Sequence, residues 1–123
     1  MMVTDENTAI CVGSGTLRVL ATPVVITLIE KTAWKSICDE MGKNSCTVGT
    51  AVNMEHIAPT PVGMEVRCET TLTAINGRSL EFKAEVYDEC GLVAKGTHTR
   101  YIVDSNKFQE KADKRNNRTD SNV

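Results

Sequence analysis

Two stretches of alternating apolar and polar residues, joined by Asn76-Gly77, limit most strictly what this chain can fold into. Apolar residues occupy every second position in much of 64–74 and again in 80–86, which is the period of a strand with one buried face. Asn-Gly is a strong signal for a tight hairpin turn. Similar composition at 46–57 and 92–103 predicts two further strands, so the chain should contain four strands in an antiparallel run.

A long helix should precede these strands. Thr22 can cap a helix with its hydroxyl, and Pro23 suits the first helical position. Apolar residues then recur at helical spacing as far as Met41, and Gly42 supplies a stop. The short apolar run 17–20 predicts one more strand before the helix. A single helix wrapped by such a sheet is an α+β layer arrangement.

Composition narrows the classes of function. The 123 residues fit one domain, and the net charge of -2 gives no basic surplus for nucleic-acid binding. No signal peptide is visible and no apolar run approaches about 18 residues, so neither export nor a membrane partner is expected. Five cysteines without metal-ligand spacing predict reduced, mostly buried thiols in a cytoplasmic protein. They are Cys11, Cys38, Cys46, Cys68 and Cys90.

The C-terminal segment predicts a tail outside the folded domain. Residues 109–123 contain many charges and no aromatic side chain, a composition typical of disordered chain. Acidic residues such as Glu110 and Asp113 dilute the basic ones, which favours a solvated tail over an interaction tail. We therefore expect a domain at 1–108 and a disordered tail at 109–123.

The two histidines are the side chains that titrate near neutral pH without perturbation. His56 ends a predicted strand on the parity of Val48, Val52 and Met54, so it should point with the apolar face. A core or interface histidine is the simpler explanation of that placement. His98 shares one face of the last strand with Arg100, and an ion pair or an exposed strand face would explain both.

Thr22 and Glu30 also have structural explanations. Glu30 stands at the edge of a wide apolar stripe, where Lys31 or Lys35 could pair with it. Thr22 before Pro23 is explained by helix capping alone. The chain has no Gly-rich phosphate loop, no H-E-x-x-H and no G-x-S-x-G motif. Spacing by itself thus leaves a soluble α+β domain of open function.

Taken together, several motifs resemble one known family. The stretches are ATPVVITLIE, TVGTAVNMEHIAPTPVGMEV, GRSLEFKAEVYDECG and KGTHTRYIVD. Their order includes Thr-Pro, a Glu eight residues after that Thr, V-G-T, H-x-A-P-T-P-x-G and a late G-x-H-x-R. Over residues 16–108 the chain resembles the hotdog-fold thioesterases related to fluoroacetyl-CoA thioesterase. The resemblance implies a long helix wrapped by a curved antiparallel sheet, in a homodimer with substrate pockets between subunits.

The resemblance also implies roles for particular residues. The catalytic threonine, glutamate and histidine of the family fall on Thr22, Glu30 and His56. The glycine lining the acyl pocket falls on Gly49, and an arginine near the substrate falls on Arg100. His56 would then be the base and Glu30 its orienting partner. Thr22 is either the nucleophile or a group that positions water, and the sequence leaves both open.

The function implied by the resemblance is hydrolysis of a small or medium acyl-CoA to the free acid and CoA, without metal or other cofactor. A dimer of dimers remains an open alternative to the simple homodimer. Two rival functions share the scaffold: a non-catalytic acyl-CoA-binding dimer and an acyl-thioester dehydratase or hydratase. The fluoroacetyl-specific member has a lid of aromatic side chains before its threonine, whereas residues 11–21 here contain none. The sequence therefore leaves selectivity for fluoroacetyl-CoA open.

Overall fold

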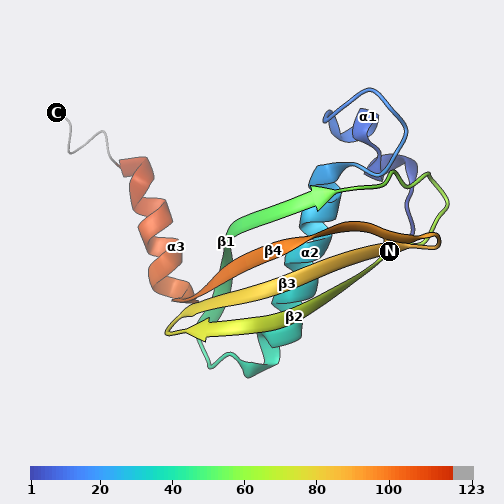
Figure 1. Cartoon of the computed structure of the whole chain (residues 1–123). Coiled ribbons are helices and arrows are strands. Elements are labelled where there is room, and N and C mark those ends of the chain that lie inside the picture. Colours follow the sequence, from blue (N-terminus) through green and yellow to red (C-terminus); the bar gives the residue numbers. More distant parts are fainter. Residues whose placement is uncertain (118–123) are drawn as a thin grey trace.

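The computed structural model describes residues 1–117 and has the predicted α+β arrangement (Figure 1). One antiparallel sheet has the strand order β1-β4-β3-β2, and the long helix α2 lies against one face of it. The main elements are α2 Thr22–Ile37, β1 Ser45–His56, β2 Arg67–Asn76, β3 Ser79–Asp88 and β4 Gly91–Asp104. The shorter helical segments are Asp5–Asn7, α1 Ala9–Val12, Cys38–Glu40, α3 Ser105–Lys114 and Arg115–Asn117. The long helix and the four later strands are thereby confirmed, but α2 ends at Ile37 and not at the predicted stop, Gly42, because the chain continues as the short helical segment Cys38–Glu40.

The apolar face of α2 forms the core together with the sheet. Its buried residues follow one another at intervals of four, as expected for one face of a helix. They are Val25, Ile29, Ala33 and Ile37. The sheet contributes buried side chains mainly from β3 and β4, including Leu80, Phe82, Ala84, Val86 and Val93. Burial of this apolar surface is what holds α2 in place on the sheet.

The hairpin between β2 and β3 is confirmed, with its turn one residue later than the motif suggested. Asn76 pairs with Ser79 as the last pair of the ladder, so Gly77 and Arg78 form the loop. Gly77 has a φ of 63°, a left-handed conformation that glycine adopts at little cost. A two-residue loop with glycine first matches the twist of the flanking strands.

The strand predicted at 17–20 is not present as a strand. Val19 and Leu20 each form only an isolated bridge, with Pro61 and Thr8 respectively. Proline has no backbone N–H and cannot extend a ladder, which explains why pairing stops there. Leu20 is nevertheless buried, with 1% of its surface exposed, so the apolar run serves packing without regular secondary structure.

A β-bulge in β1 changes the faces on which its residues lie. The register with β4 shifts between Gly49 and Ala51, and a bulge of this kind reverses the alternation of side chains. Val48 pairs with Tyr101, which is 43% exposed, whereas His56 pairs with buried Ala94. The predicted shared parity of Val48 and His56 is therefore wrong, because the strand was assumed to be regular.

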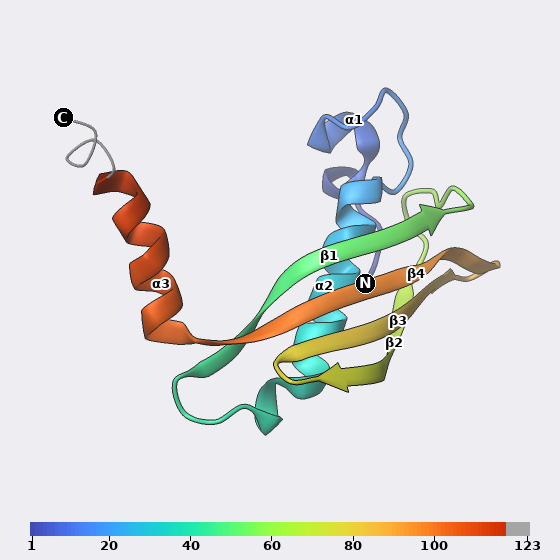
Figure 2. The same ribbon diagram turned by 60° about the vertical axis from the view of Figure 1, so that its left-hand side comes forward.

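The first part of the predicted tail is helical. Helix α3 starts after Asp104, whose carboxylate accepts a hydrogen bond of 2.9 Å from the backbone N–H of Lys107. Its Lys, Gln, Glu and Ala residues favour helix, so a high content of charged residues does not prevent regular structure here. The helix extends away from the sheet and buries none of its side chains (Figure 2). Residues 118–123 lie outside the described residues, and the division at 108 stays a prediction.

Two expectations from composition concern cysteines and membranes. All five thiols are free, but Cys11 and Cys90 are exposed and the other three are only partly buried. The expected burial is therefore wrong, since these residues lie at loops and edges as well as on packed faces. Among residues 1–117, no helix combines the length and apolar character needed to cross a membrane.

We expect Ile29→Ala to lower the free energy of unfolding by about 2–5 kcal/mol, because it removes a fully buried side chain from the core. Ile75 is 63% exposed, so Ile75→Ala is the matched control and should cost less than about 0.5 kcal/mol. Urea unfolding at equal protein concentration measures both. Equal losses would contradict the role given to the α2 face.

Candidate active site

A cleft of about 350 Å³ lies where α1, the start of α2 and the end of β1 meet. Most of its lining is small or aliphatic: Ala9, Val19, Leu20, Ile57, Ala58 and Pro59. Thr22, His56 and Ser14 complete the lining. An apolar cleft with a few convergent polar groups is the usual form of a small-molecule site. Two of the side chains selected from the sequence therefore share one cavity.

Thr22 begins α2 but does not cap it. The N-cap is Ala21, whose carbonyl accepts hydrogen bonds from the N–H groups of Val24 and Val25. Thr22 is the first helical residue, with Pro23 next, so the predicted capping role of its hydroxyl is wrong. That oxygen instead lies 2.8 Å from Nδ1 of His56. The hydroxyl is consequently available for chemistry in the cleft.

His56 ends β1 and presents both ring nitrogens to different surroundings. Nδ1 meets the Thr22 hydroxyl, while Nε2 is buried and has no hydrogen-bond partner within the described chain. Burial lowers the pKa of His56 below its usual value of 6.5, and the backbone of Ala58 partly offsets this. A lowered pKa favours the neutral imidazole at pH 7, which is the form that can accept a proton.

A second polar cluster lies under the middle of α2. Arg100 on β4 is 7% exposed, and its Nη1 is 3.6 Å from Oε2 of Glu30. Its Nε and Nη2 donate to the hydroxyl and the carbonyl of Thr47, at 2.9 and 3.0 Å. Desolvation lowers the pKa of Arg100, and the Glu30 carboxylate acts in the opposite direction. The ion pair thus stabilises the charges of Arg100 and Glu30, which are both partly buried.

Gly49 provides the space for this cluster. It pairs with Arg100 across the β1–β4 ladder, so the two residues lie on the same face. A Cβ atom at position 49 would lie 2.5 Å from Oε2 of Glu30 and 3.3 Å from Nη1 of Arg100. With any larger residue at position 49, the Glu30 carboxylate would have to move. Gly49 therefore allows the carboxylate to lie where it does.

The structure brings the five selected residues together in two groups. Thr22 and His56 are in contact, and Glu30, Gly49 and Arg100 form the other group. Glu30 pairs with Arg100 instead of Lys31 or Lys35. Within residues 1–117, no hydrogen bond joins Glu30 to His56, because Thr22 and Glu30 are separated by about 12 Å of helix at 1.5 Å per residue.

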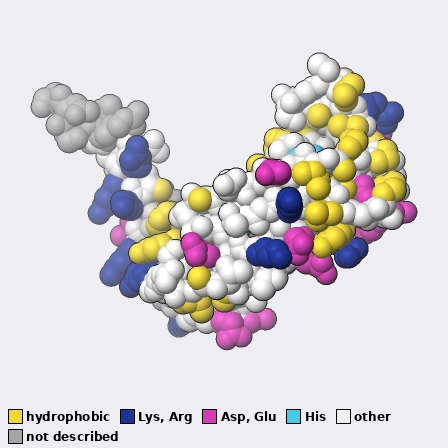
Figure 3. Space-filling view, in the orientation of Figure 1, with side chains coloured by type: hydrophobic (Ala, Val, Ile, Leu, Met, Phe, Trp, Pro, Cys, Tyr) yellow, Lys and Arg dark blue, Asp and Glu magenta, His cyan; other side chains and the backbone are white. Residues whose placement is uncertain are grey.

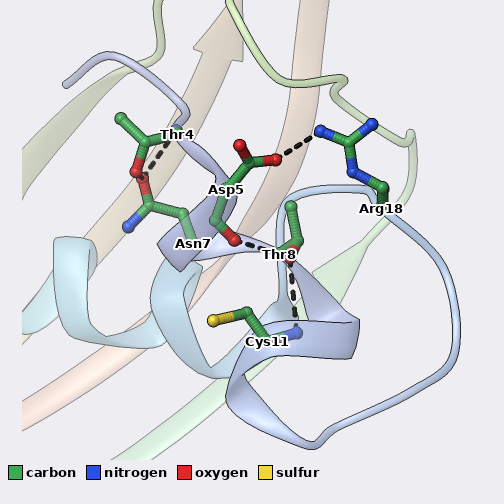
Figure 4. Close-up of polar contacts among 6 residues, drawn as sticks. All are labelled: Thr4, Asp5, Asn7, Thr8, Cys11 and Arg18. Atoms are coloured by element: carbon green, nitrogen blue, oxygen red, sulfur yellow. Dashed lines mark hydrogen bonds and ion pairs between the residues drawn. The ribbon is translucent and has the colours of Figure 1, made fainter.

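The N-terminal segment that forms one wall of the cleft is held by local polar contacts (Figure 4). The Thr8 hydroxyl donates to the carbonyl of Asp5 and accepts from the N–H of Cys11, which caps α1. Arg18 forms an ion pair with Asp5 across the loop. These contacts fix the backbone that carries Ala9 and Val19 into the cleft. These contacts were not predictable from the sequence, since the segment has no clear periodicity.

The surface around α1 is more apolar than the surface of α3. Hydrophobic side chains gather at the α1 end of the molecule, while basic side chains lie along α3 at the other end (Figure 3). The α1 region exposes Ile10, Val12 and Leu17 at 54%, 43% and 66%.

Among residues 1–117, no group of three or more His, Cys, Asp or Glu side chains could hold a metal ion.

Comparison with solved structures defines the class of fold. A Thermus thermophilus member of the thioesterase superfamily has a TM-score of 0.90, at 24% identity over 98% of this chain and 90% of that chain. A hot-dog-like protein from Thermanaerovibrio acidaminovorans has a TM-score of 0.85, at 17% identity, covering 94% and 85% of the two chains. The protein therefore has the hotdog fold.

The family is shown by sequence. A family model described as fluoroacetyl-CoA-specific thioesterase matches residues 3–106, and the chain belongs to this family. The fluoroacetyl-CoA thioesterase of Streptantibioticus cattleyicolor is 28% identical over 94 residues, which cover 76% of this chain and 68% of the relative. A solved structure of a fluoroacetyl-CoA thioesterase has a TM-score of 0.89 at 23% identity, over 93% of this chain and 89% of that chain.

We expect Gly49→Ala to reduce thioester hydrolysis by roughly tenfold or more, because the added methyl group displaces the Glu30 carboxylate and misplaced groups are costly in turnover. Gly42→Ala is the control, since a Cβ there meets nothing within 4 Å. Turnover and thermal unfolding should be measured for both variants. Full activity in Gly49→Ala would mean that the position of Glu30 does not matter.

Proposed function

We propose that this hotdog thioesterase is a cytoplasmic homodimer that hydrolyses a small or medium acyl-CoA to the free acid and CoA. Membership of the thioesterase family supports acyl-CoA thioester hydrolysis. The observation that carries the proposal is the 2.8 Å contact between Thr22 and His56 in a cleft lined mainly by aliphatic residues. A hydroxyl next to a neutral imidazole is the arrangement that base-assisted attack on a thioester carbonyl requires.

His56 acts as the general base in this proposal. In one form of the reaction, His56 takes the proton of the Thr22 hydroxyl, the oxygen attacks the carbonyl carbon, and CoA leaves as a thiol. Water then hydrolyses the acyl-threonine ester and releases the acid. In the other form, Thr22 positions a water molecule that His56 deprotonates, and acid and thiol form without an acyl-enzyme. Backbone N–H groups at the start of α2 or near Gly49 are suited to stabilise the developing oxyanion.

The open edge of β1 is the proposed dimer contact. In the strand order β1-β4-β3-β2, β1 pairs with β4 only and has no strand on its other side in the described chain. A long edge strand is a template for pairing with another chain. If two β1 strands pair antiparallel, the Gly49 end of one approaches the His56 end of the other. Each cleft would then be completed by a second copy.

This dimer would bring together the two groups of selected residues that are apart within one chain. Glu30 and Gly49 of one copy would approach Thr22 and His56 of the other, with Arg100 holding Glu30. The buried Nε2 of His56, which has no partner in its own described chain, would receive the carboxylate that orients it. Gly49 would then line the acyl pocket and Arg100 would stand close to the substrate. A dimer of dimers is compatible with the same arrangement.

The lining of the cleft favours an uncharged acyl group. Its walls are mainly Ala, Val, Leu, Ile and Pro side chains, which suit a short aliphatic chain. The crystal structure of a variant of the fluoroacetyl-CoA-specific thioesterase in complex with fluoroacetate and CoA supports an acyl-CoA as the ligand of this chain. A panel of short, medium, branched and aromatic acyl-CoAs, with release of free thiol followed in time, would identify the preferred acyl group.

We expect His56→Ala to reduce hydrolysis of the best acyl-CoA in this panel by roughly 100-fold or more, because a positioned general base commonly contributes about 10² to 10⁴. Thr22→Ser should retain more activity than Thr22→Ala, since serine preserves the hydroxyl. Glu30→Gln should impair turnover at nearly constant volume. Thermal unfolding of each variant is the control for folding.

The same measurements separate hydrolysis from its rivals. If His56→Ala is folded and keeps near wild-type turnover, His56 is a packing residue. Wild-type protein that binds acyl-CoA but releases no thiol would be a binding module. Conversion of an enoyl-CoA or a hydroxyacyl-CoA without thiol release would identify a hydratase or dehydratase.

We further expect a dimer at micromolar concentration, because pairing of the open β1 edge satisfies backbone groups and closes the cleft. Sedimentation velocity measures the mass directly. A stable folded monomer that still hydrolyses acyl-CoA would contradict the shared site, whatever the roles of Thr22 and His56.

A further inference from the structure

His98 is the largest fully buried polar side chain among the described residues, and it has no role in the proposed reaction. It lies on β4, two residues before Arg100, and only 1% of its surface is exposed. Its Nδ1 is 2.8 Å from the carbonyl oxygen of Ala51, and its Nε2 is 3.2 Å from Nη1 of Arg100. Both ring nitrogens therefore have partners, which come from β1 on one side and β4 on the other.

These two partners determine the tautomer of the ring. An arginine side chain has only donors, so Nε2 of His98 must accept from Arg100. A backbone carbonyl only accepts, so Nδ1 must carry the proton and donate it to Ala51. The imidazole is consequently neutral, with hydrogen on Nδ1. Ala51 directly follows the register shift of β1, where bulges disturb the regular ladder, so His98 also satisfies backbone at the bulge.

Arg100 gains a fixed orientation from this contact. Thr47 holds Nε and Nη2, and His98 holds Nη1, the nitrogen that lies 3.6 Å from Glu30. The guanidinium is planar, so partners on three nitrogens fix both its position and its plane. Loss of the acceptor at His98 would leave Nη1 free to move toward Glu30 or away from it. The carboxylate beside Gly49 would shift accordingly.

We propose that His98 is a positioning residue for thioester hydrolysis: as the neutral Nδ1–H tautomer it accepts from Arg100 and so holds the Glu30 carboxylate against Gly49. The inference rests on the proposed function, in which Glu30 takes part in turnover. His98 touches neither Thr22 nor His56 in the described chain and is not a catalytic residue. Its effect is transmitted through Arg100 to Glu30.

If His98 served packing alone, only the shape of its side chain would matter. The His98 ring stacks on Phe82, with centroids 6.2 Å apart and planes at 28°, and an apolar side chain could fill the same space. Such a side chain would leave the Ala51 carbonyl and the Arg100 nitrogen without their partners, and buried polar groups without partners are costly. The donor and acceptor pattern of His98, in addition to its shape, is thus what the site uses.

Two substitutions separate the two hydrogen bonds. In His98→Gln the side-chain oxygen can replace Nε2 and still accept from Arg100, whereas in His98→Asn the side-chain NH₂ can replace Nδ1 and still donate to Ala51. We expect His98→Gln to keep kcat within a few-fold of wild type. His98→Asn should lower kcat by roughly 10-fold to 100-fold with KM for acyl-CoA little changed, because a displaced group costs turnover more than binding. Both variants lose one hydrogen bond, so a purely structural role predicts equal effects.

The proposal can fail separately from the proposed function. Imidazole ¹⁵N NMR of the wild-type protein should show His98 with hydrogen on Nδ1 and a bare Nε2, and this measurement needs no turnover. Hydrogen on Nε2, or equal kcat in His98→Asn and His98→Gln, would overturn the positioning role. In the Glu30→Gln background, His98→Asn should cause little further loss of kcat. If Glu30→Gln is itself fully active while the tautomer is as stated, it is the proposed role of Glu30 that fails.

Discussion

The contact between the apolar face of α2 and the sheet is the interaction on which the rest of the structure depends. Four buried residues at intervals of four hold the helix along the sheet, and burial of apolar surface is the main force that favours this arrangement. The contact sets the helix in one register. Its first residue, Thr22, therefore reaches the end of β1, and Glu30 lies above Gly49.

A polar cluster within this packed layer is possible because its groups satisfy one another. A buried charge is costly unless it is paired and hydrogen-bonded, and Arg100 has partners in Thr47, His98 and Glu30. Gly49 supplies the space for the carboxylate, and the neighbouring bulge turns the end of β1 so that His56 faces the cleft. The two groups of selected residues thus lie at different points along β1, which is the arrangement that the proposed homodimer requires.

The main elements of the fold were predictable because strand and helix periodicity are local properties. Alternation over 80–86 requires only that one face of β3 be buried, whatever packs against it. The errors lie where local patterns compete with context. Ala21 caps α2 in place of Thr22, the turn is centred on Gly77 and Arg78, and α3 forms where charge suggested disorder. The first two errors concern backbone contacts, which the pattern of side chains does not report, whereas α3 forms because its residues favour helix and Asp104 caps it.

The sequence by itself determined the helix, the four strands and, through its motifs, the family and the five residues selected for the site. Only the tertiary structure decided how those residues are grouped. Glu30 has lysines as neighbours along the chain, yet it pairs with Arg100, seventy positions away. The contacts of His98 with Ala51 and Arg100 were not visible beforehand, although the G-x-H-x-R motif includes both His98 and Arg100. Hydrogen-bond partners depend on distances of a few ångströms between distant segments, and those distances exist only once the sheet, its bulge and α2 have packed together.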